Sequence, residues 1–271
     1  MTGTPPIEPT VDKRILDRLN TKVAHPARVY DYLLGGKDNF AADRETAESF
    51  PEKTAQAARA NRAFLARAVT FLTQEAGIRQ FLDVGTGLPT ANNTHEVAQR
   101  IARDSRVVYV DNDPMVLLHA KTLLTSTDTG KTSYIDADLR DPQTILSHAA
   151  EVLDFTQPVA LMLISILHFL KDEERPYEIV RAFLDAFPPG SYLAITHLAG
   201  DTNPDGAEVS RRFNERSSSQ TRPRTRAECA EFFDGLELVD PGLVPWSQWR
   251  PRSELEAAAQ AMGWAGVGKK P

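Results

Sequence analysis

Phe81-Leu82-Asp83-Val84-Gly85-Thr86-Gly87 is a short apolar run that ends in an acidic residue and two glycines one residue apart. Downstream, the apolar run Val107-Val108-Tyr109-Val110 ends in Asp111. Glycines let the backbone of a turn approach a ligand closely, and an acid at the end of the next strand can accept bonds from two ribose hydroxyls. Together, the two stretches predict a nucleotide-type cofactor site on a parallel sheet.

Apolar runs alternate with helical patterns around this motif. Strands are predicted at residues 80–84, 106–111, 132–137, 159–166 and 192–197. Helices are predicted between them, at residues 94–103, 114–124, 142–150 and 173–186. Strands that alternate with helices indicate a doubly wound, Rossmann-like α/β fold, in which right-handed crossovers keep the strands parallel.

The chain before this region has a helical pattern. We expect residues 1–77 to form a helical N-terminal extension, with a helix after Thr10, a segment that starts at His25-Pro26 and a long helical stretch at residues 43–76. Residues 78–271 are expected to form the sheet domain, in one compact unit with the extension.

The C-terminal part has a less regular pattern. Polar segments that contain prolines run from residue 199 to 226, and a helix is predicted at residues 226–233. Asp240-Pro241-Gly242 interrupts the apolar run at residues 236–244, which predicts a bulge or a turn there. A final strand is predicted at residues 264–268.

Composition limits the classes of protein to which this chain can belong. It has 271 residues, of which 41% are hydrophobic and 25% are charged, as in ordinary globular proteins. The net charge of −6 argues against a broad nucleic-acid-binding surface. We see neither a membrane span nor a signal-peptide pattern, and the single cysteine, Cys229, excludes a cysteine-rich metal site. We therefore expect a cytoplasmic protein with no metal centre.

The turn after the first strand favours one kind of cofactor. A dinucleotide fingerprint would place a third glycine about three residues after Gly87, where this chain has Thr90. Pro89 removes a backbone donor that a pyrophosphate would use. The turn therefore fits a cofactor without a diphosphate, such as S-adenosylmethionine (SAM), better than it fits NAD. An NAD-dependent oxidoreductase is the less favoured alternative.

A third acidic residue follows the third predicted strand. Asp138 can accept a bond from the exocyclic amine of adenine, and Leu139 can offer its backbone amide and an apolar contact to the ring. A single acid at a strand end is often only a helix cap, and a glycine pair is often only a turn. Acids at three successive strand ends favour cofactor binding over these simpler interpretations.

Longer motifs make the sequence similar to a known family. They are His25-Pro26-Ala27-Arg28-Val29-Tyr30-Asp31-Tyr32-Leu33-Leu34-Gly35-Gly36-Lys37-Asp38-Asn39-Phe40, the stretch from Phe81 to Thr90, Asn93-Thr94-His95-Glu96, Val110-Asp111-Asn112-Asp113-Pro114, Gly242-Leu243-Val244-Pro245, Trp249-Arg250-Pro251 and Gly266-Val267-Gly268-Lys269-Lys270-Pro271. In these motifs the chain resembles a bacterial S-adenosyl methyltransferase family, formerly a domain of unknown function, within the class I SAM-dependent methyltransferases. The resemblance covers almost the whole chain after about Leu19.

This resemblance implies a seven-stranded, mostly parallel sheet whose last strand, at residues 264–268, is antiparallel. The residues expected to bind the cofactor in the sheet domain are Asp83, Gly85, Thr86, Gly87, Asp111, Asn112, Asp138, Leu139 and Ser165. Among them, the first acid and the glycines are implied to face the methionine half of SAM. The second acid is implied to hold the ribose, and the third acid, with the leucine after it, to face adenine. No particular methyl acceptor is implied.

The segment from Tyr30 to Phe40 surrounds a double glycine with polar and aromatic residues. One interpretation is a helix C-cap followed by a loop, with the tyrosines as packing residues. We favour a lid over the cofactor, in which Tyr30 or Tyr32 and Gly35 line the methionine end. Arg62 could reach the same site, although a solvated helix face is the favoured interpretation for it.

Methyl transfer from a sulfonium is an in-line displacement, so positioning can replace a dedicated catalytic residue. A general base is useful only where the acceptor carries a proton. His168, just after the fourth strand, is the candidate base, with a packed or hydrogen-bonded histidine as the alternative. His197, at the end of the fifth strand, is a weaker candidate.

The sequence leaves the methyl acceptor open. The Asn/Asp-Pro-Pro-Tyr/Phe loop of amino-directed methyltransferases is missing after the fourth strand. An arginine-rich run from Arg211 to Arg226 predicts a solvated loop or helix face, or else attraction of an anionic substrate. We expect a small-molecule acceptor, with no membrane or nucleic-acid partner. A protein that binds SAM or S-adenosylhomocysteine (SAH) without methyltransferase activity is the alternative.

Overall fold

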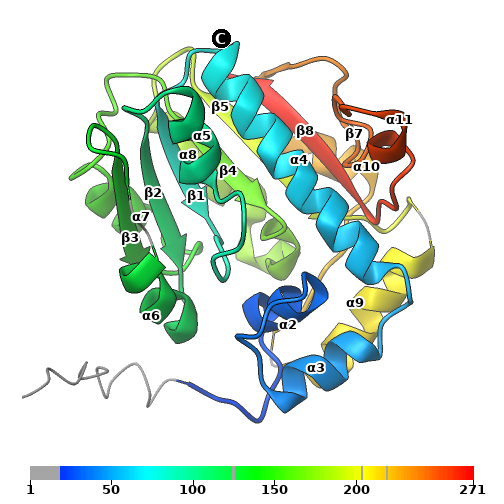
Figure 1. The fold of residues 1–271 in the computed structure, drawn as a ribbon. Coiled ribbons are helices and arrows are strands. Elements are labelled where there is room, and N and C mark those ends of the chain that lie inside the picture. Colours follow the sequence, from blue (N-terminus) through cyan, green and yellow to red (C-terminus); the bar gives the residue numbers. More distant parts are fainter. Residues whose placement is uncertain (1–18, 124–125, 203, 218) are drawn as a thin grey trace, which may run out of the picture.

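The computed structural model describes residues 19–123, 126–202, 204–217 and 219–271. In these residues a twisted sheet carries helices on both faces (Figure 1). Its strands are β1 Gln80–Val84, β2 Arg106–Asp111, β3 Lys131–Asp136, β4 Ala160–Ile164, β5 Tyr192–Leu198, β6 Glu237–Leu238, β7 Val244–Pro245 and β8 Gly263–Lys269. The helices are α2 Pro26–Leu33, α3 Ala41–Glu48, α4 Thr54–Gln74, α5 Thr94–Ile101, α6 Pro114–Leu123, α7 Pro142–Ala149, α8 Pro176–Asp185, α9 Pro204–Arg216, α10 Arg226–Glu231 and α11 Glu254–Ala257, with short 3-10 helices η1 Leu167–Phe169 and η2 Asp172–Glu174.

The strand order across the sheet is β3-β2-β1-β4-β5-β8-β6, and β7 also pairs with β8. Strands β1 to β5 are parallel, so their carboxyl ends lie along one edge of the sheet. Strand β8 runs antiparallel to β5. This arrangement confirms the predicted doubly wound fold with an antiparallel last strand. The strand order reverses between β1 and β4, and open α/β sheets bind ligands at such a switch point.

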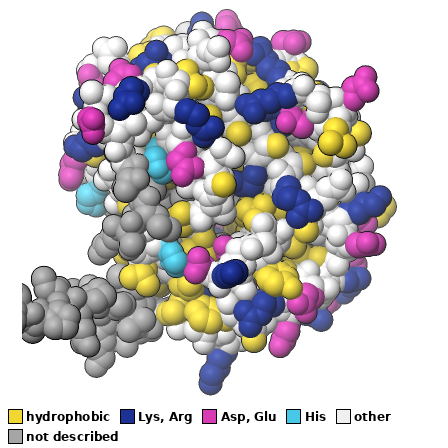
Figure 2. Space-filling view, viewed as in Figure 1, with side chains coloured by type: hydrophobic (Ala, Val, Ile, Leu, Met, Phe, Trp, Pro, Cys, Tyr) yellow, Lys and Arg dark blue, Asp and Glu magenta, His cyan; other side chains and the backbone are white. Residues whose placement is uncertain are grey.

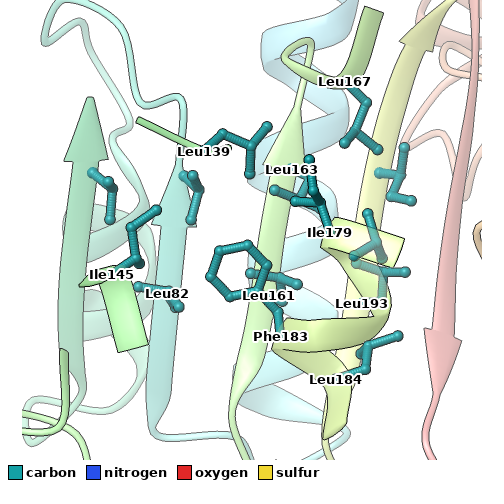
Figure 3. Close-up of a cluster of buried hydrophobic side chains, with 14 of the residues drawn as sticks. Leu82, Leu139, Ile145, Leu161, Leu163, Leu167, Ile179, Phe183, Leu184 and Leu193 are labelled. Atoms are coloured by element: carbon teal, nitrogen blue, oxygen red, sulfur yellow. The ribbon is translucent and has the colours of Figure 1, made fainter. Parts of the chain in front are cut away.

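The sheet is buried on both faces because successive strand residues point to opposite sides. On one face, Leu82, Leu161 and Leu193 pack with Ile145 of α7 and Phe183 of α8 (Figure 3). Burial of each such side chain contributes roughly 1.5–3 kcal/mol. The sequences of these strands are therefore continuous apolar runs, as expected for a parallel sheet covered by helices on both sides.

The predicted N-terminal extension divides into two structural parts. Helix α4 is a layer of the sheet domain, because Phe64 and Leu72 pack against Phe81 of β1 and Val107 of β2. Helices α2 and α3 lie instead beyond the carboxyl ends of the strands, next to α9 (Figure 1). The helix predicted after Thr10 falls on residues 1–18, outside the described ranges.

Two features of the C-terminal part bear on the sequence prediction. The turn predicted at Asp240-Pro241-Gly242 is confirmed, because Gly242 adopts a φ of 86° and its amide donates to the Val239 carbonyl oxygen, and this turn separates the two-residue strands β6 and β7. The described sheet therefore has eight strands, whereas the resemblance implied seven. Helix α9 was not predicted, but Glu208 and Glu215 form ion pairs with Arg211 at helical spacing.

The described helices were also compared with the requirements of a membrane span. None of them combines sufficient length with sufficient apolarity to cross a bilayer.

Candidate functional site

A cavity of about 620 Å³ lies at the carboxyl ends of the parallel strands. Its volume falls within the range of small-molecule sites, roughly 300–1,000 Å³. We call the lining residues that follow the strands the polar half; they are Asp83, Gly85, Thr86, Gly87, Asp111, Asn112, Asp138, Leu139 and Ser165. We call one set of apolar lining residues the apolar half; they are Phe50, Leu65, Leu198, Val209, Phe213, Trp246 and Met262. Every cofactor-binding residue predicted in the sheet domain therefore lines the same cavity.

The glycine turn after β1 forms the floor of the polar half. Gly85 has a φ of 77°, and a Cβ at this position would lie 2.5 Å from Cγ1 of Ile166. Gly87 has a φ of 67°, but a Cβ there would meet nothing within 4 Å. Close packing therefore requires the first glycine, whereas the second leaves open space over the turn.

Two carboxylates flank this turn, Asp83, which is buried, and Asp111, which is half-buried. Asp83 is only 4% exposed and accepts a hydrogen bond of 2.6 Å from the Thr94 hydroxyl, and burial raises its pKa to about 6. Asp111 accepts bonds from the backbone amides of Gly87, at 2.8 Å, and Asp113, at 3.0 Å, and burial also raises its pKa. Because burial opposes ionisation of both groups, a cationic or hydroxyl-bearing ligand beside them would relieve a desolvation cost.

The third predicted acid is tied to its neighbours. Asp138 accepts a bond of 3.1 Å from the Asn112 side-chain amide and one of 2.9 Å from the backbone amide of Arg140. These bonds join the loops that follow β2 and β3. The acids of the polar half thus come from three neighbouring strand ends, as the sequence predicted.

Helix α2 contributes one of the three residues predicted from its motif. Tyr30 lines the cavity, and its hydroxyl donates to the carbonyl oxygen of Ala58 at 3.1 Å. Tyr32 and Gly35 lie outside the cavity lining. The Tyr32 hydroxyl donates to Glu48 at 2.7 Å, because residues two apart on a helix point in different directions. Gly35, with a φ of 87°, follows the end of α2.

Helix α4 contributes three polar residues to the cavity, Thr54, Asn61 and Arg62. Arg62 lines it and donates to the carbonyl oxygens of Ala91, at 3.4 Å, and Asn92, at 3.2 Å, so the favoured interpretation of a purely solvated face is wrong. Asn61 also lines the cavity and was missed by sequence reasoning. Its position on the apolar stripe of α4, between Ala57 and Phe64, is the signal that could have identified it.

His168 lies on η1 and lines the cavity. Burial, together with the nearby positive charge of Arg224, lowers its pKa to about 3, and its Nδ1 atom makes no hydrogen bond to any residue that the structure describes. His197 is fully buried outside the lining. Its Nδ1 lies 2.8 Å from the Leu198 carbonyl, and its Nε2 lies 3.1 Å from Arg224 Nη1. His168 is therefore a neutral imidazole at the site, whereas His197 belongs to the packing behind it.

The remaining chemical groups named from the sequence lie outside the lining. Cys229 is buried in α10, and burial raises the pKa of its thiol to about 12. Arg211, Arg212 and Arg222 form ion pairs with nearby acids, and Figure 2 shows basic and acidic side chains intermingled on the face it presents. No cluster of possible metal ligands occurs among the residues that the structure describes.

The polar half fits SAM by its chemistry. Its carboxylates suit the methionine ammonium and the ribose hydroxyls of that molecule, and the space over Gly87 leaves room for it. The turn also lacks the third glycine and the helix N-terminus close behind it that a dinucleotide would use.

Comparisons with known proteins point the same way. Residues 12–271 match the model of the S-adenosyl methyltransferase family. The structure is similar to that of a DUF574 family protein from Streptomyces avermitilis, with 45% identity over 93% of this chain and 99% of that one and a TM-score of 0.89. A protein from Thermobifida fusca shares 42% identity over 94% of this chain and 97% of its own, with a TM-score of 0.85.

A SAM-dependent methyltransferase from Anabaena variabilis shares the fold, with 13% identity over 94% of this chain and 98% of its own and a TM-score of 0.52. A search of curated proteins gave no match.

Proposed function

Because this chain belongs to the S-adenosyl methyltransferase family, we propose that it transfers the methyl group of SAM to a small molecule with a largely apolar body. Family membership makes it a methyltransferase with SAM as its cofactor, and the nature of the acceptor is the proposal. The observation that carries it is the apolar half, whose side chains share one cavity with the acids of the polar half.

The polar half is proposed to bind the cofactor. Asp83 would meet the methionine ammonium, Asp111 the ribose hydroxyls, and Asp138 with the Leu139 amide the adenine ring. Each hydrogen bond to a charged group contributes roughly 1.5–3 kcal/mol. Tyr30, from the segment predicted to be a lid, would close the methionine end. When bound, SAM supplies a methyl group made electrophilic by the positive charge on sulfur.

The apolar half is proposed to hold the acceptor and to exclude water. Correct orientation alone can lower the activation free energy of methyl transfer by roughly 7–11 kcal/mol. His168 is proposed to contact the acceptor. An imidazole with a pKa of about 3 takes up a proton poorly at neutral pH, so the site suits an acceptor atom that needs little help from a base.

The test is transfer of labelled methyl from SAM into a cell extract separated by size. We expect the label in low-molecular-weight products that partition into organic solvent. Label in protein or nucleic acid would contradict the small-molecule proposal. No transfer to any fraction, by protein shown calorimetrically to bind SAM, would favour a binding protein without activity. A thermal-shift panel should show stabilisation by SAM and SAH, whereas stabilisation by NAD alone would favour the oxidoreductase alternative.

A further inference from the structure

We infer that Asn61 Oδ1 is a hydrogen-bond acceptor for the ligand at the methyl-transfer end of the cavity, and that the methyl acceptor therefore carries an N–H or O–H group there. This inference rests on the proposed function, because it concerns the acceptor of the same reaction. It adds a residue on α4, far from the motifs that bind the cofactor, to the groups that recognise the substrate.

The hydrogen bonds around Asn61 determine which way its amide faces. Asn61 Nδ2 donates to the Tyr30 hydroxyl at 2.7 Å and to Ser165 Oγ at 2.9 Å, which uses both amide hydrogens. Tyr30 donates its own proton to the carbonyl oxygen of Ala58, so its oxygen is left to accept from Asn61. The amide nitrogen therefore faces Tyr30 and Ser165.

The amide oxygen is left without a partner. Asn61 is only 1% exposed, it lines the cavity, and its Oδ1 makes no hydrogen bond within the described structure. A buried polar atom left unsatisfied costs roughly 1–3 kcal/mol. A ligand that donates a hydrogen bond to this atom would recover that cost on binding.

Ser165 places this amide at the reacting end of the site. It directly follows β4, with a φ of 56°, and its backbone amide bonds to both the carbonyl oxygen and the hydroxyl of Thr196 on β5, at 3.1 and 2.9 Å. The end of β4 adjoins β1 at the switch point of the sheet. Asn61 thus connects α2 and α4 to the end of β4, which is followed by η1 with His168, the residue proposed to contact the acceptor.

The charges around the cavity favour a donor group over an anion. Asp83 and Asp111 line the same cavity as Asn61. An anionic ligand group beside Asn61 Oδ1 would be repelled by these carboxylates and by the partial negative charge of the amide oxygen. Arg62, which follows Asn61 on α4, already donates to two backbone carbonyls, and Arg140 in the same lining is paired with Asp138 and Glu174. An amine, an amide or a hydroxyl is therefore the group that matches Oδ1.

Sinefungin and SAH provide a test that needs no known acceptor. Sinefungin has a carbon with a primary amine at the position of the methylated sulfur of SAM. SAH has an unmethylated sulfur at this position. By calorimetry, we expect Asn61→Leu and Asn61→Ala to lower sinefungin affinity about tenfold more than they lower SAH affinity, since only sinefungin loses a bond from a charged donor. Asn61→Asp, which retains an acceptor oxygen, should keep the wild-type preference for sinefungin.

Three outcomes would overturn the inference. Equal losses for the two ligands would mean that Asn61 binds their common part or only supports the fold. Unchanged affinity for both ligands in Asn61→Leu and Asn61→Ala would mean that Oδ1 meets no ligand donor. Failure of the wild-type protein to bind SAH would overturn the proposed function, and the inference with it.

Discussion

The polar and apolar halves of the cavity share one space, yet the chain builds them differently. The polar half comes from the ends of neighbouring strands, where Asp83 and Asp111 directly follow apolar runs and Asp138 comes two residues after β3. The apolar half gathers Phe50, Val209 and Trp246, among others, from segments far apart in the chain. In one half, electrostatics and backbone hydrogen bonds position charged groups. In the other, the packing of distant segments shapes an apolar wall.

This difference separates binding of the cofactor from recognition of the acceptor. Changes in the polar half should alter SAM affinity, whereas changes in the apolar half should leave it intact and reduce methyl transfer. Helix α4 adjoins both halves through Asn61, Arg62 and Leu65. The following predictions test the separation in order of decreasing effect on SAM affinity.

Asp111→Ala is expected to have the largest effect. It removes the carboxylate proposed to accept two ribose hydroxyls, and each bond contributes roughly 1.5–3 kcal/mol, so SAM affinity should fall about 100-fold or more by calorimetry. Asp136→Ala is the matched control, because Asp136 lies beside Asp111 in the sheet but is exposed and outside the cavity lining. Less than a tenfold loss in Asp111→Ala, or an equal loss in the control, would contradict the assignment.

Acidic pH should weaken SAM binding through Asp83. Its pKa of about 6 means that the carboxyl is largely protonated at pH 5 and cannot attract the methionine ammonium. We expect roughly tenfold lower affinity at pH 5 than at pH 7, because each pH unit below the pKa reduces the ionised fraction about tenfold. Titration calorimetry of the wild type and Asp83→Asn checks this, since the variant should bind weakly at both pH values.

The raised pKa of Asp83 should also make the free energy of unfolding depend on pH. Between about pH 4 and pH 6 the folded protein holds a proton on Asp83 that the unfolded chain has released, so the free energy of unfolding falls as pH rises through this window. Without ligand, Asp83→Asn should be more stable than the wild type at pH 7, by roughly 1–3 kcal/mol in urea titrations. A less stable variant would show that Asp83 ionises without cost.

Tyr30→Phe and Tyr32→Phe form a pair with different expected results. Tyr30→Phe removes the acceptor for Asn61 Nδ2 and the bond to Ala58, so SAM affinity should fall about fivefold. Tyr32→Phe removes a bond to Glu48 outside the cavity and should change affinity less than twofold. Isothermal calorimetry at one pH compares them, and a larger effect for Tyr32→Phe would contradict the placement of α2.

Phe213→Ala should have the smallest effect on SAM affinity, within twofold, but should reduce transfer of labelled methyl. Phe213 packs with Val29 and Phe50 at the edge of the apolar half, so the variant should also lose about 3 kcal/mol of stability. Phe183→Ala, in the core under one face of the sheet and outside the cavity lining, is the control for stability alone. Equal transfer by the two variants, both measured while folded, would separate Phe213 from acceptor binding.

The polar half was largely predictable because its signals are local. An acid after an apolar run and a glycine pair are neighbours in sequence, and parallel strands bring such ends to one edge. The placement of Tyr30 and Tyr32 was less predictable, since either residue of the Tyr-Asp-Tyr motif could have faced the site until the rotation of α2 was known. Helix α9 was missed because paired charges, rather than a strong apolar pattern, dominate its sequence.

By itself, the sequence determined the alternation of strands and helices, the acids at three strand ends and the family of the chain. Periodicity and local turn chemistry encode these features within short stretches. Only the tertiary structure decided that Asn61, His168 and Phe213 meet around one cavity and that Asn61 Oδ1 is left without a partner. Their approach depends on how α4, η1 and α9 pack, and hydrogen bonds between residues as distant as Asn61 and Ser165 leave no local pattern in the chain.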